Sequence, residues 1–258
     1  MKSVLVTGGT VRLGKAIAAR LRAEGWRVLT SSHRADTGAD IVADLSEPMG
    51  AARLYAAALK LLGGNPPDAL VNNAALFTGD DAAIAAVNLE APKKLTMLMA
   101  GRETGIGAVV NILDSVILGS LEPMGSVPKV PEDSNAPKVP EDSNGAKVPK
   151  DSNDAKIPED SNDAKVPKDS KRPYLSAKRE LAAFTRSAAA TFAATLRVNA
   201  VAPGPVLAPT EVHMKAGEML LDRRPTPDDV AAAVSYLLSA ESVTGVVLPV
   251  DSGQYLIV

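Results

Sequence analysis

Tyr174 and Lys178 are separated by three residues in a segment rich in alanine. If the segment is helical, this spacing puts both side chains on one face. A lysine beside a phenol stabilises the phenolate, so we expect Lys178 to lower the pKa of Tyr174 from about 10 toward the working pH. A tyrosine in that state can donate or take a proton while a hydride moves. Because the same spacing is common on surface helices, the hypothesis depends on the segments that accompany it.

A second candidate site is the segment Thr7–Gly14, TGGTVRLG, which follows a short apolar run. Gly8 permits a tight turn, and Gly14 permits close packing of the helix that follows. That helix presents its first N–H groups and the positive end of its dipole to a pyrophosphate. Arg12, beside Leu13, stands where many dinucleotide-binding folds have a glycine, and it is either a phosphate ligand or a solvated residue. We therefore expect a dinucleotide site at this turn.

The end of the second expected strand bears on which dinucleotide binds. NAD-binding folds usually place an acidic side chain there to hold the ribose 2′-hydroxyl. Here His33 and Arg34 occupy that place, and the first acidic residue, Asp36, lies beyond them. A cationic pair suits a 2′-phosphate, whereas the alternative is a pair of solvated loop charges. The sequence therefore favours NADP(H) as the cofactor.

Strand-like and helical patterns alternate along most of the chain. The expected strands are short apolar runs at residues 3–7, 26–31, 40–43, 68–72, 107–113, 197–201 and 243–250. The expected helices have apolar residues at helical spacing, at residues 13–24, 49–62, 80–100, 174–195 and 227–239. Such alternation is typical of an α/β fold, a doubly wound parallel sheet of the Rossmann type. Ligands of such sheets bind at the carboxyl ends of the strands, where most of the candidate residues lie.

Residues 126–171 differ from the rest in composition. Units such as KVPEDSNAP recur, and the lysines at positions 129, 138, 147, 156 and 165 set a period of nine. A proline in each unit disrupts a helix, and one large apolar residue per unit cannot offset the entropy lost on ordering. We expect a largely disordered, polyproline-like insert between the fifth strand and the catalytic helix, with a solenoid as the alternative. Three roles are open for this insert: a passive expansion, a lid, or a tether for a partner. We expect residues 1–125 and 172–258 to form one catalytic domain.

The bulk composition excludes several classes of protein. The 258 residues are 46% apolar, carry a formal net charge of −2 and include no cysteine. This charge gives no strong attraction to nucleic acid or to an anionic membrane, and the lack of cysteine excludes disulfides and thiolate metal sites. No apolar run approaches the roughly 20 residues that span a bilayer, and no signal-peptide pattern is present. We expect a cytoplasmic protein that acts on a small-molecule substrate and has no metal site.

Several further segments accompany the glycine turn and the Tyr174–Lys178 pair. They are VNNAA at residues 71–75, VNLEAP at 87–92, VVNILD at 109–114, RVNAVAPGPV at 197–206 and VTGVVLPVDSG at 243–253. In this order they resemble the short-chain dehydrogenase/reductase family, over nearly the whole chain outside the insert. The resemblance implies an oxidoreductase that uses a nicotinamide dinucleotide. It also implies a homo-oligomer, a tetramer or a dimer, packed through the long helices and the last strand.

The resemblance implies roles for individual residues by position. Lys178 would also bind the nicotinamide ribose, and Asn88 would hold a water in a proton relay with that lysine. The residues implied to contact the cofactor are Asp44 at the adenine, Asn73 and Ala74 after the fourth strand, and Pro203 and Gly204 beside the nicotinamide. The implied mobile substrate loop runs over residues 206–223 and begins at Val206.

One departure from the family is informative. Asp114 stands where the family usually has its catalytic serine, three residues after Asn111. Asp114, the Arg-Leu-Gly of the glycine turn and the His-Arg pair all resemble the pteridine reductase branch. Phe77 matches the aromatic residue that in this branch sandwiches a pterin against the nicotinamide, and an aromatic face suits a flat heterocycle. Ala75 departs from the branch, which has a pterin-contacting serine there.

A carboxyl group beside Tyr174 suits the reduction of a C=N bond. The hypothesis is that Asp114 and Tyr174 share a proton, which passes to a ring nitrogen as hydride arrives from NADPH. If Asp114 is only a solvated loop residue, Ser115 is the alternative. The leading prediction is an NADPH-dependent, pteridine-reductase-like enzyme. The alternatives are a generic carbonyl or ketoacyl reductase, and a non-catalytic NADP-binding regulator that uses the repeats for interaction.

Overall fold

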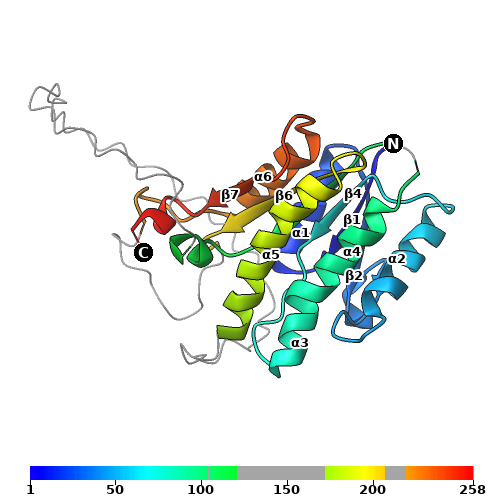
Figure 1. Ribbon diagram of the computed structural model, residues 1–258, viewed down its shortest axis with the longest axis horizontal. Helices are drawn as coiled ribbons and strands as arrows, with labels where there is room; N and C mark the ends of the chain where they lie inside the picture. Colours follow the sequence, from blue (N-terminus) through cyan, green and yellow to red (C-terminus); the bar gives the residue numbers. More distant parts are fainter. Residues whose placement is uncertain (104, 121–171, 207–218, 258) are drawn as a thin grey trace, which may run out of the picture. The chain divides into compact units, whose positions relative to one another are not determined.

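The computed structural model describes residues 1–103, 105–120, 172–206 and 219–257 (Figure 1). The chain divides into two units, one formed by Met1–Leu121 with Pro167–Val258 and the other by Glu122–Val166. The second unit lies outside the described residues, and so does the insert predicted for residues 126–171. All the elements described below belong to the first unit.

A parallel sheet of seven strands forms the centre of this unit, in the order β3-β2-β1-β4-β5-β6-β7. The strands are β1 (Ser3–Thr7), β2 (Arg27–Ser32), β3 (Ile41–Val42), β4 (Ala69–Asn72), β5 (Gly107–Ile112), β6 (Leu196–Pro203) and β7 (Val247–Val250). The strand order changes direction between β1 and β4, and open α/β sheets bind ligands at such a switch point. The predicted doubly wound, Rossmann-type fold is confirmed.

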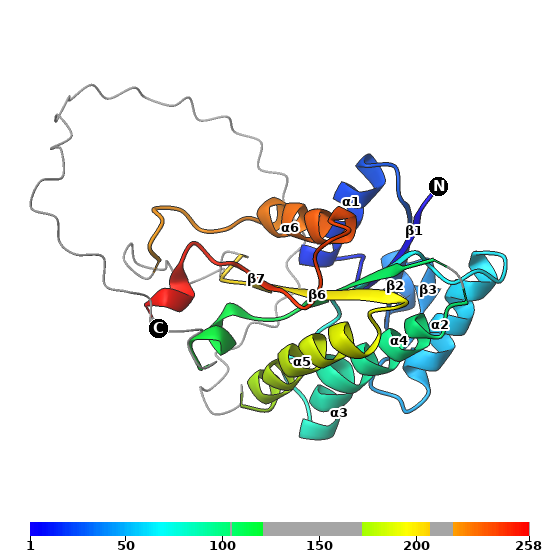
Figure 2. The same cartoon turned by 45° about the horizontal axis from the view of Figure 1, so that its top comes forward.

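Helices cover both faces of this sheet. They are α1 (Arg12–Ala23), α2 (Gly50–Leu61), α3 (Asp81–Ala85), α4 (Ala91–Ala100), α5 (Arg172–Thr191) and α6 (Pro227–Ser239). Figure 2 shows α1 and α6 on one face, and α2, α4 and α5 on the other. Two apolar clusters match these layers, one joining the sheet to α1 and α6 and the other joining it to α2, α4 and α5.

The first strand illustrates why the central strands are uninterrupted apolar runs. Val4, Leu5 and Val6 of β1 are all fully buried. Val4 and Val6 belong to the cluster of α1 and α6, whereas Leu5 belongs to the cluster of α2 and α4. Successive side chains of a strand point to opposite faces, so a sheet covered on both faces needs apolar residues at every position.

Several elements differ from the sequence-based expectation, among them α5, which covers Arg172–Thr191 instead of residues 174–195, and β6, which extends to Pro203 instead of residue 201. The helix expected over residues 80–100 is divided into α3 and α4 by a π-helical turn, Ala86–Glu90. A π-helical turn arises from a shift in backbone pairing, which the spacing of apolar residues does not reveal. The last strand begins at Val247 instead of Val243, because Gly245 has a φ of +78°, which is incompatible with a strand.

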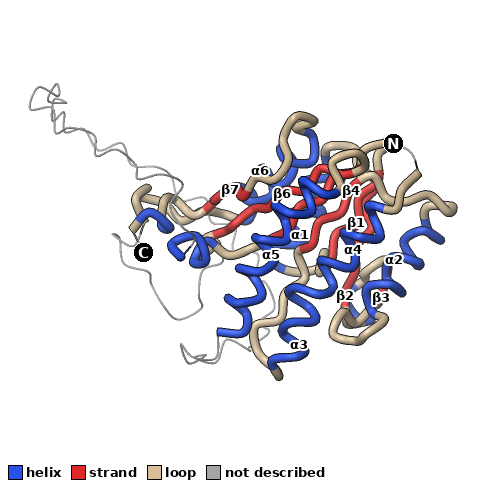
Figure 3. The backbone as a smooth tube through the Cα atoms, in the orientation of Figure 1, coloured by secondary structure: helices blue, strands red, loops and turns tan. Residues whose placement is uncertain are grey.

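The carboxyl ends of β1, β4, β5 and β6 lie along one edge of the sheet, as the ends of parallel strands must. Figure 3 shows the loops and short helices that continue from the strands. The candidate functional residues belong largely to these connections and to the first turns of α1 and α5. Within the described residues, no helix is both long enough and apolar enough to cross a membrane.

Candidate active site

The first two turns of α5 hold Tyr174 and Lys178 against the sheet. These residues are only 4% and 2% exposed. Further along the same helix, Leu181 packs in an apolar cluster that includes residues of β6, which fixes the face that α5 turns inward. The Nζ atom of Lys178 donates a hydrogen bond to the carbonyl oxygen of Ile112, the last residue of β5, at 2.8 Å. The helix therefore places both side chains at the carboxyl end of β5.

Asp114 follows β5 by two residues and reaches the same point. The Tyr174 hydroxyl donates a hydrogen bond to its Oδ2 atom at 3.3 Å. Its Oδ1 atom accepts a hydrogen bond from the Val116 N–H at 3.0 Å, which fixes the carboxylate in the turn after the strand. The expected proximity of Asp114 and Tyr174 is thus present, although 60 residues separate them in the chain.

The electrostatics of the pair differ from the expectation for Tyr174. Burial raises the pKa of Tyr174 well above its usual value, and the Asp114 carboxylate raises it further through its charge and its hydrogen bond. The predicted lowering of this pKa is contradicted, because burial and the Asp114 carboxylate outweigh the effect of Lys178, whose Nζ atom lies 5.5 Å from the ring centroid and donates to a carbonyl. Burial lowers the pKa of Lys178 to about 8, and the Asp114 charge partly opposes that effect. Tyr174 therefore keeps its proton at neutral pH and is suited to donate it.

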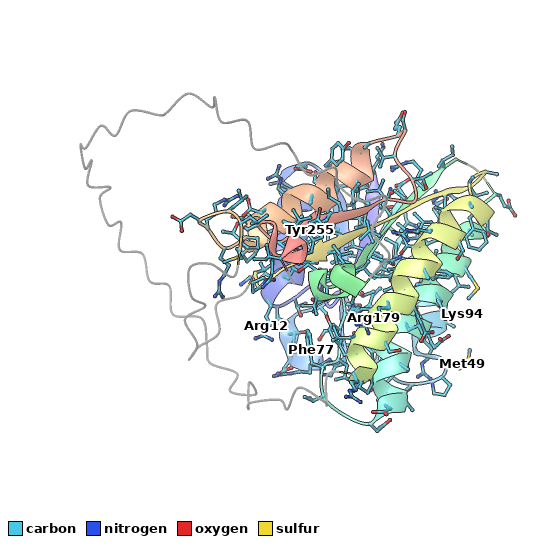
Figure 4. The ribbon with its side chains drawn as sticks, turned by 60° about the vertical axis from the view of Figure 1, so that its left-hand side comes forward. Arg12, Met49, Phe77, Lys94, Arg179 and Tyr255 are labelled. Atoms are coloured by element: carbon cyan, nitrogen blue, oxygen red, sulfur yellow. The ribbon has the colours of Figure 1, made fainter. Side chains whose placement is uncertain are left out.

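Phe77 covers this group from the loop between β4 and α3. Its ring centroid lies 4.6 Å from that of Tyr174, with the planes tilted by 37°. The residue is 46% exposed, so the ring contacts the buried phenol and also presents an open apolar surface. Figure 4 labels Phe77 and Arg12, which are drawn in the same part of that view. The structure thus brings Phe77 and Asp114, two of the residues expected at the substrate, together with Tyr174.

Asn88 lies in the π-helical turn and is fully buried. Its Nδ2 atom donates hydrogen bonds to the carbonyl oxygens of Leu76 at 2.7 Å and Ile84 at 2.9 Å. Its Oδ1 atom accepts a hydrogen bond from the Leu76 N–H at 3.3 Å. The side chain of Asn88 therefore fixes the loop that carries Phe77, which the sequence did not indicate. Its role in a proton relay remains a prediction.

A buried polar chain that the sequence analysis missed connects β4 and β5 to α5. The Nδ2 atom of Asn72 donates to Oδ1 of Asn111 at 2.8 Å, and Nδ2 of Asn111 donates to Oγ1 of Thr185 at 2.9 Å. All three residues are buried, with at most 2% exposed. Asn72 and Asn111 are paired in the register of the two strands, which could have indicated their contact. These side-chain hydrogen bonds fix α5 relative to β5, the strand that precedes Asp114.

The glycine turn is as compact as the sequence indicates. Gly8 has a φ of +60°, and a Cβ atom at Gly14 would lie 2.0 Å from the carbonyl oxygen of Gly8. Asn73 closes the turn, since its Nδ2 atom donates to the carbonyl oxygens of Thr7 and Gly8, both at 3.0 Å. The Thr7 hydroxyl oxygen accepts hydrogen bonds from the N–H groups of Asn73 and Ala74. Thr7 is a further residue of the site, and its position at the end of the first strand is the signal that could have found it.

The start of α1 is suited to a phosphate group. The residue that precedes the helix, Val11, makes no side-chain capping hydrogen bond, and the first turn contains no acidic residue. The N–H groups and the helix dipole therefore favour an anion. Arg12 is exposed and has a φ of +47°, an uncommon conformation for a residue other than glycine. Leu13, which was also expected at the cofactor, is partly exposed and packs against the apolar cluster of α1 and α6.

The residues expected at the adenosine end lie after β2 and β3, which are paired. His33 and Arg34 are exposed, and Arg34 forms a two-point ion pair with Asp36, at 3.0 Å from Nε to Oδ1 and 2.6 Å from Nη2 to Oδ2. The Oδ1 atom of Asp44 accepts hydrogen bonds from the N–H and hydroxyl of Ser46, and these lower the pKa of Asp44. The ion pair of Arg34 is a feature that the sequence analysis did not anticipate.

The residues expected beside the nicotinamide lie at the end of β6. The Gly204 N–H donates to the Val250 carbonyl, and a Cβ atom at Gly204 would lie 2.7 Å from the Cβ atom of Asp251. Pro203 is buried, and Val206 packs against the apolar cluster of α1 and α6. The expected substrate loop continues into residues 207–218, which lie outside the described residues.

Ser115, the alternative to Asp114, is 1% exposed. Within the part of the chain that the structure describes, its hydroxyl has no hydrogen-bond partner, whereas Asp114 contacts Tyr174 directly. Among the same residues, no cluster of histidine, aspartate and glutamate side chains has the arrangement of a metal site. The geometry therefore favours Asp114 as the partner of the tyrosine.

Comparisons with known proteins agree with this geometry. Residues 160–254 match the protein family described as enoyl-(acyl carrier protein) reductase. A Streptomyces violaceoruber protein designated ketoacyl reductase 2 of the granaticin polyketide synthase is 30% identical, over 98% of this chain and 96% of its own. Glucose 1-dehydrogenase 2 of Bacillus subtilis (strain 168) is 27% identical, over 99% of this chain and 95% of its own.

Solved structures give a similar result. The crystal structure of FolM alternative dihydrofolate reductase 1 from Brucella canis, complexed with NADP, matches with a TM-score of 0.71 and 27% identity. The match covers 99% of this chain and 94% of that chain. The corresponding protein from Brucella suis, also in complex with NADP, matches with a TM-score of 0.70.

Proposed function

We infer that this chain, which belongs to the short-chain dehydrogenase/reductase family, is an NADP-dependent oxidoreductase. The relative that is 30% identical over 98% of the chain carries the assignment to the family. The glycine turn, the uncapped start of α1 and the exposed Arg34 supply backbone donors and positive charge for a dinucleotide with a 2′-phosphate. When bound there, NADPH supplies the hydride.

The fit of a dinucleotide to the turn is supported by its backbone. A Cβ atom at Gly14 would collide with the Gly8 carbonyl, so the turn and the helix approach each other as closely as glycine allows. Asn73 holds that turn against the end of β4. We expect the pyrophosphate at the N–H groups of α1, the 2′-phosphate at His33 and Arg34, the adenine near Asp44, and the nicotinamide between Tyr174 and the Pro203-Gly204 turn.

The finer proposal is that the substrate is a pterin or a dihydrofolate-like heterocycle. The observation that carries it is the Tyr174–Asp114 hydrogen bond beneath the exposed ring of Phe77. A carboxylate at this place can assist protonation of a ring nitrogen, and a half-exposed aromatic ring can stack on a flat heterocycle. The likeness to FolM alternative dihydrofolate reductase 1 supports the same substrate class.

The chain's own residues move the proton as follows. Tyr174 remains protonated, since burial and the Asp114 carboxylate both disfavour the phenolate, and its hydroxyl donates the proton to the substrate. Asp114 accepts the Tyr174 hydrogen bond in the resting state and stays in place through the Val116 N–H. Lys178, charged below about pH 8, compensates the negative charge that remains on the tyrosine after proton transfer.

The test is oxidation of NADPH by the purified full chain, with dihydrobiopterin or dihydrofolate beside a panel of ketones. Tyr174→Phe is the catalytic control. Oxidation that depends on the pterin and is lost in Tyr174→Phe is the expected result. Oxidation with ketones alone would keep the tyrosine chemistry and discard the pterin. NADPH binding without any turnover would favour a non-catalytic regulator, and deletion of the repeats would then be the next experiment.

A generic carbonyl or ketoacyl reductase is the second candidate. The likeness to the granaticin ketoacyl reductase covers 98% of this chain, and it favours that substrate class independently of Phe77. The arrangement of Tyr174 and Lys178 serves a ketone as well as an imine, because both substrates need a proton at the atom beside the hydride acceptor.

Three broader features complete the proposal. We expect the enzyme to work in the cytoplasm, as a homotetramer or homodimer, on a free small molecule rather than on a nucleic acid. The near-neutral net charge of −2 supports the last point. Whether the nine-residue repeats form a lid, a tether or a passive expansion is a matter for the deletion experiment above.

A further inference from the structure

Asp40 closes the loop that carries His33 and Arg34, the two residues expected at the 2′-phosphate. Its Oδ2 atom accepts hydrogen bonds from the N–H and from the hydroxyl of Thr30 in β2, both at 2.7 Å. The N–H of Asp40 in turn donates to the Thr30 hydroxyl oxygen at 3.4 Å. Three hydrogen bonds therefore join one residue of β2 to the residue that directly precedes β3.

Thr30 is a firm attachment point for this loop. It is only 3% exposed, and a Cβ atom at Gly9 of the glycine turn would lie 2.8 Å from its methyl group. The carbonyl of the next residue, Ser31, accepts the Gly9 N–H at 3.2 Å. The Arg22 guanidinium lies 4.0 Å from the Oδ2 atom of Asp40, so the shorter contacts with Thr30 supply most of the hold on this carboxylate.

Within the loop, the backbone of Arg34 is held on both sides. Its N–H donates to the hydroxyl of Ser32 at 3.1 Å, and its carbonyl oxygen accepts from the hydroxyl of Thr37 at 3.1 Å. Gly38 has a φ of +69°, which lets the chain reverse before Asp40. A loop closed in this way gives the Arg34 side chain a fixed origin, and a ligand binds more tightly when its partner is already in place.

We propose that Asp40 is a positioning residue for the cofactor, which ties the loop of Arg34 to Thr30 and thereby sets a preference for a dinucleotide with a 2′-phosphate. The proposal rests on the proposed function, because it assumes that His33 and Arg34 meet that phosphate. The sign of the effect distinguishes a tether from a charge. If Asp40 acted only through its charge, its removal would relieve repulsion and tighten the binding of a phosphate, whereas loss of a tether weakens it.

Binding of adenosine fragments tests the tether without any turnover. The full chain and its variants are titrated with 2′,5′-ADP and with 5′-AMP, which differ by the 2′-phosphate alone, and the ratio of the two dissociation constants is compared. We expect Asp40→Ala to weaken 2′,5′-ADP about fivefold and to leave 5′-AMP nearly unchanged. Asp40→Asn keeps an acceptor oxygen for both Thr30 donors and should retain most of the parent ratio.

Asp68 supplies a matched control for the loss of such a carboxylate. Its Oδ2 atom accepts hydrogen bonds from the N–H and the hydroxyl of Ser3, at 2.7 Å and 3.0 Å, which is the same arrangement at the start of β1. Asp68→Ala should therefore lower the melting temperature without changing the ratio.

A second variant removes the other partner of the tether. Thr30→Val keeps a methyl group beneath Gly9 and loses the hydroxyl, while the N–H of residue 30 still reaches Asp40. It should weaken 2′,5′-ADP less than Asp40→Ala does. The double variant should be no worse than Asp40→Ala alone, because both changes act on one interaction. Losses that multiply would overturn the tether.

Hydrogen exchange of the free chain separates the tether from the cofactor assignment. The peptide of residues 33–40 should exchange faster in Asp40→Ala than in the parent, and at the parent rate in Asp68→Ala. Faster exchange with a reduced ratio, restored in Asp40→Asn, supports the proposal. Tighter 2′,5′-ADP in both Asp40 variants, or an unchanged ratio despite faster exchange, would overturn it. A parent chain that binds both fragments equally would overturn it through its premise, the 2′-phosphate, on which the exchange rates do not depend.

Discussion

The turn after β1 and the cluster at the end of β5 are built from different parts of the chain's chemistry, backbone groups in the first and side chains in the second. The turn offers backbone groups, and it works because side chains are absent at Gly8 and Gly14. The cluster works through the side chains of Asp114, Tyr174 and Lys178, which are brought together from two segments. Adding an atom should damage the first region, and removing an atom should damage the second.

The difference also concerns which forces hold each region. The turn is fixed by short-range hydrogen bonds from Thr7 and Asn73, close to the strand ends. The cluster depends on the burial of α5 and on the polar chain through Asn111 and Thr185. Electrostatic effects are therefore large in the cluster, where burial shifts the pKa of Tyr174 and of Lys178 in opposite directions.

Removing one oxygen from the cluster should have the largest effect. Tyr174→Phe keeps the ring that contacts Phe77 but loses the proton donor, and we expect kcat to fall by roughly 10²- to 10⁴-fold. Binding of NADPH should be nearly unchanged, because the turn is intact. The matched control is Tyr236→Phe, at an exposed tyrosine of α6. Steady-state kinetics and a binding titration check this, and a variant with normal kcat would show that another residue donates the proton.

Adding one carbon to the turn should have the next largest effect. Gly14→Ala places a Cβ atom against the Gly8 carbonyl and the Asn73 amide, so the turn must open. We expect NADPH to bind about 10- to 100-fold more weakly, with a lower melting temperature. Gly101→Ala is the control, since its nearest neighbour would lie 3.6 Å away in ordinary contact. Unchanged NADPH affinity in Gly14→Ala would mean that the dinucleotide does not use this turn.

The sequence predicted the turn better than the cluster. Glycines after an apolar strand encode a backbone shape directly, and Gly8 and Gly14 have the roles expected of them. The strand and helix ranges were also close, since apolar periodicity reports which face is buried. The π-helical turn at Ala86–Glu90 was missed because it depends on backbone pairing.

The properties of the cluster come from burial and from partners distant in the chain. The spacing of Tyr174 and Lys178 predicted their common helix face, but the direction of the Tyr174 pKa shift depends on burial and on Asp114. The carbonyl that binds Lys178 belongs to Ile112, whose side chain gives no signal of that role. The sequence shows that Arg34 and Asp36 lie in the same loop. It does not show that their exposed side chains adopt conformations that form an ion pair.

The pH dependence of activity sharpens the description of the cluster. The pKa of Lys178 is lowered to about 8, so its ammonium is present below that pH and is lost above it. We therefore expect kcat/KM to fall as the pH rises through about 8. The Asp114 charge raises the pKa of Lys178, so Asp114→Asn should move this fall to lower pH and should reduce kcat/KM about tenfold near neutrality. Asp81→Asn, at an exposed carboxylate of α3, should leave the profile in place.

A pH–rate profile of the two variants beside the parent chain is the measurement. A profile of Asp114→Asn that matches the parent would show that Asp114 does not act on Lys178. A fall displaced to higher pH would have the wrong sign for a lost negative charge, and it would exclude Lys178 as the group that titrates.

The smallest expected effect lies at the adenosine end of the proposed cofactor site. This region belongs to neither class fully, because here exposed side chains, and not backbone groups, are expected to bind part of the dinucleotide. Asp36 accepts two hydrogen bonds from the Arg34 guanidinium. These hydrogen bonds lower the pKa of Asp36, so its carboxylate is charged at neutral pH. The charged carboxylate competes with a 2′-phosphate for the same guanidinium. Asp36→Asn should therefore tighten NADPH about twofold, as expected for an exposed ion pair, and leave NADH unchanged. Titrations at low and high salt measure this, because salt should reduce the difference between the two chains. Weaker NADPH binding in Asp36→Asn would mean that Asp36 orients Arg34 for the phosphate instead of competing with it, and an equal change for NADH would place the 2′-phosphate elsewhere.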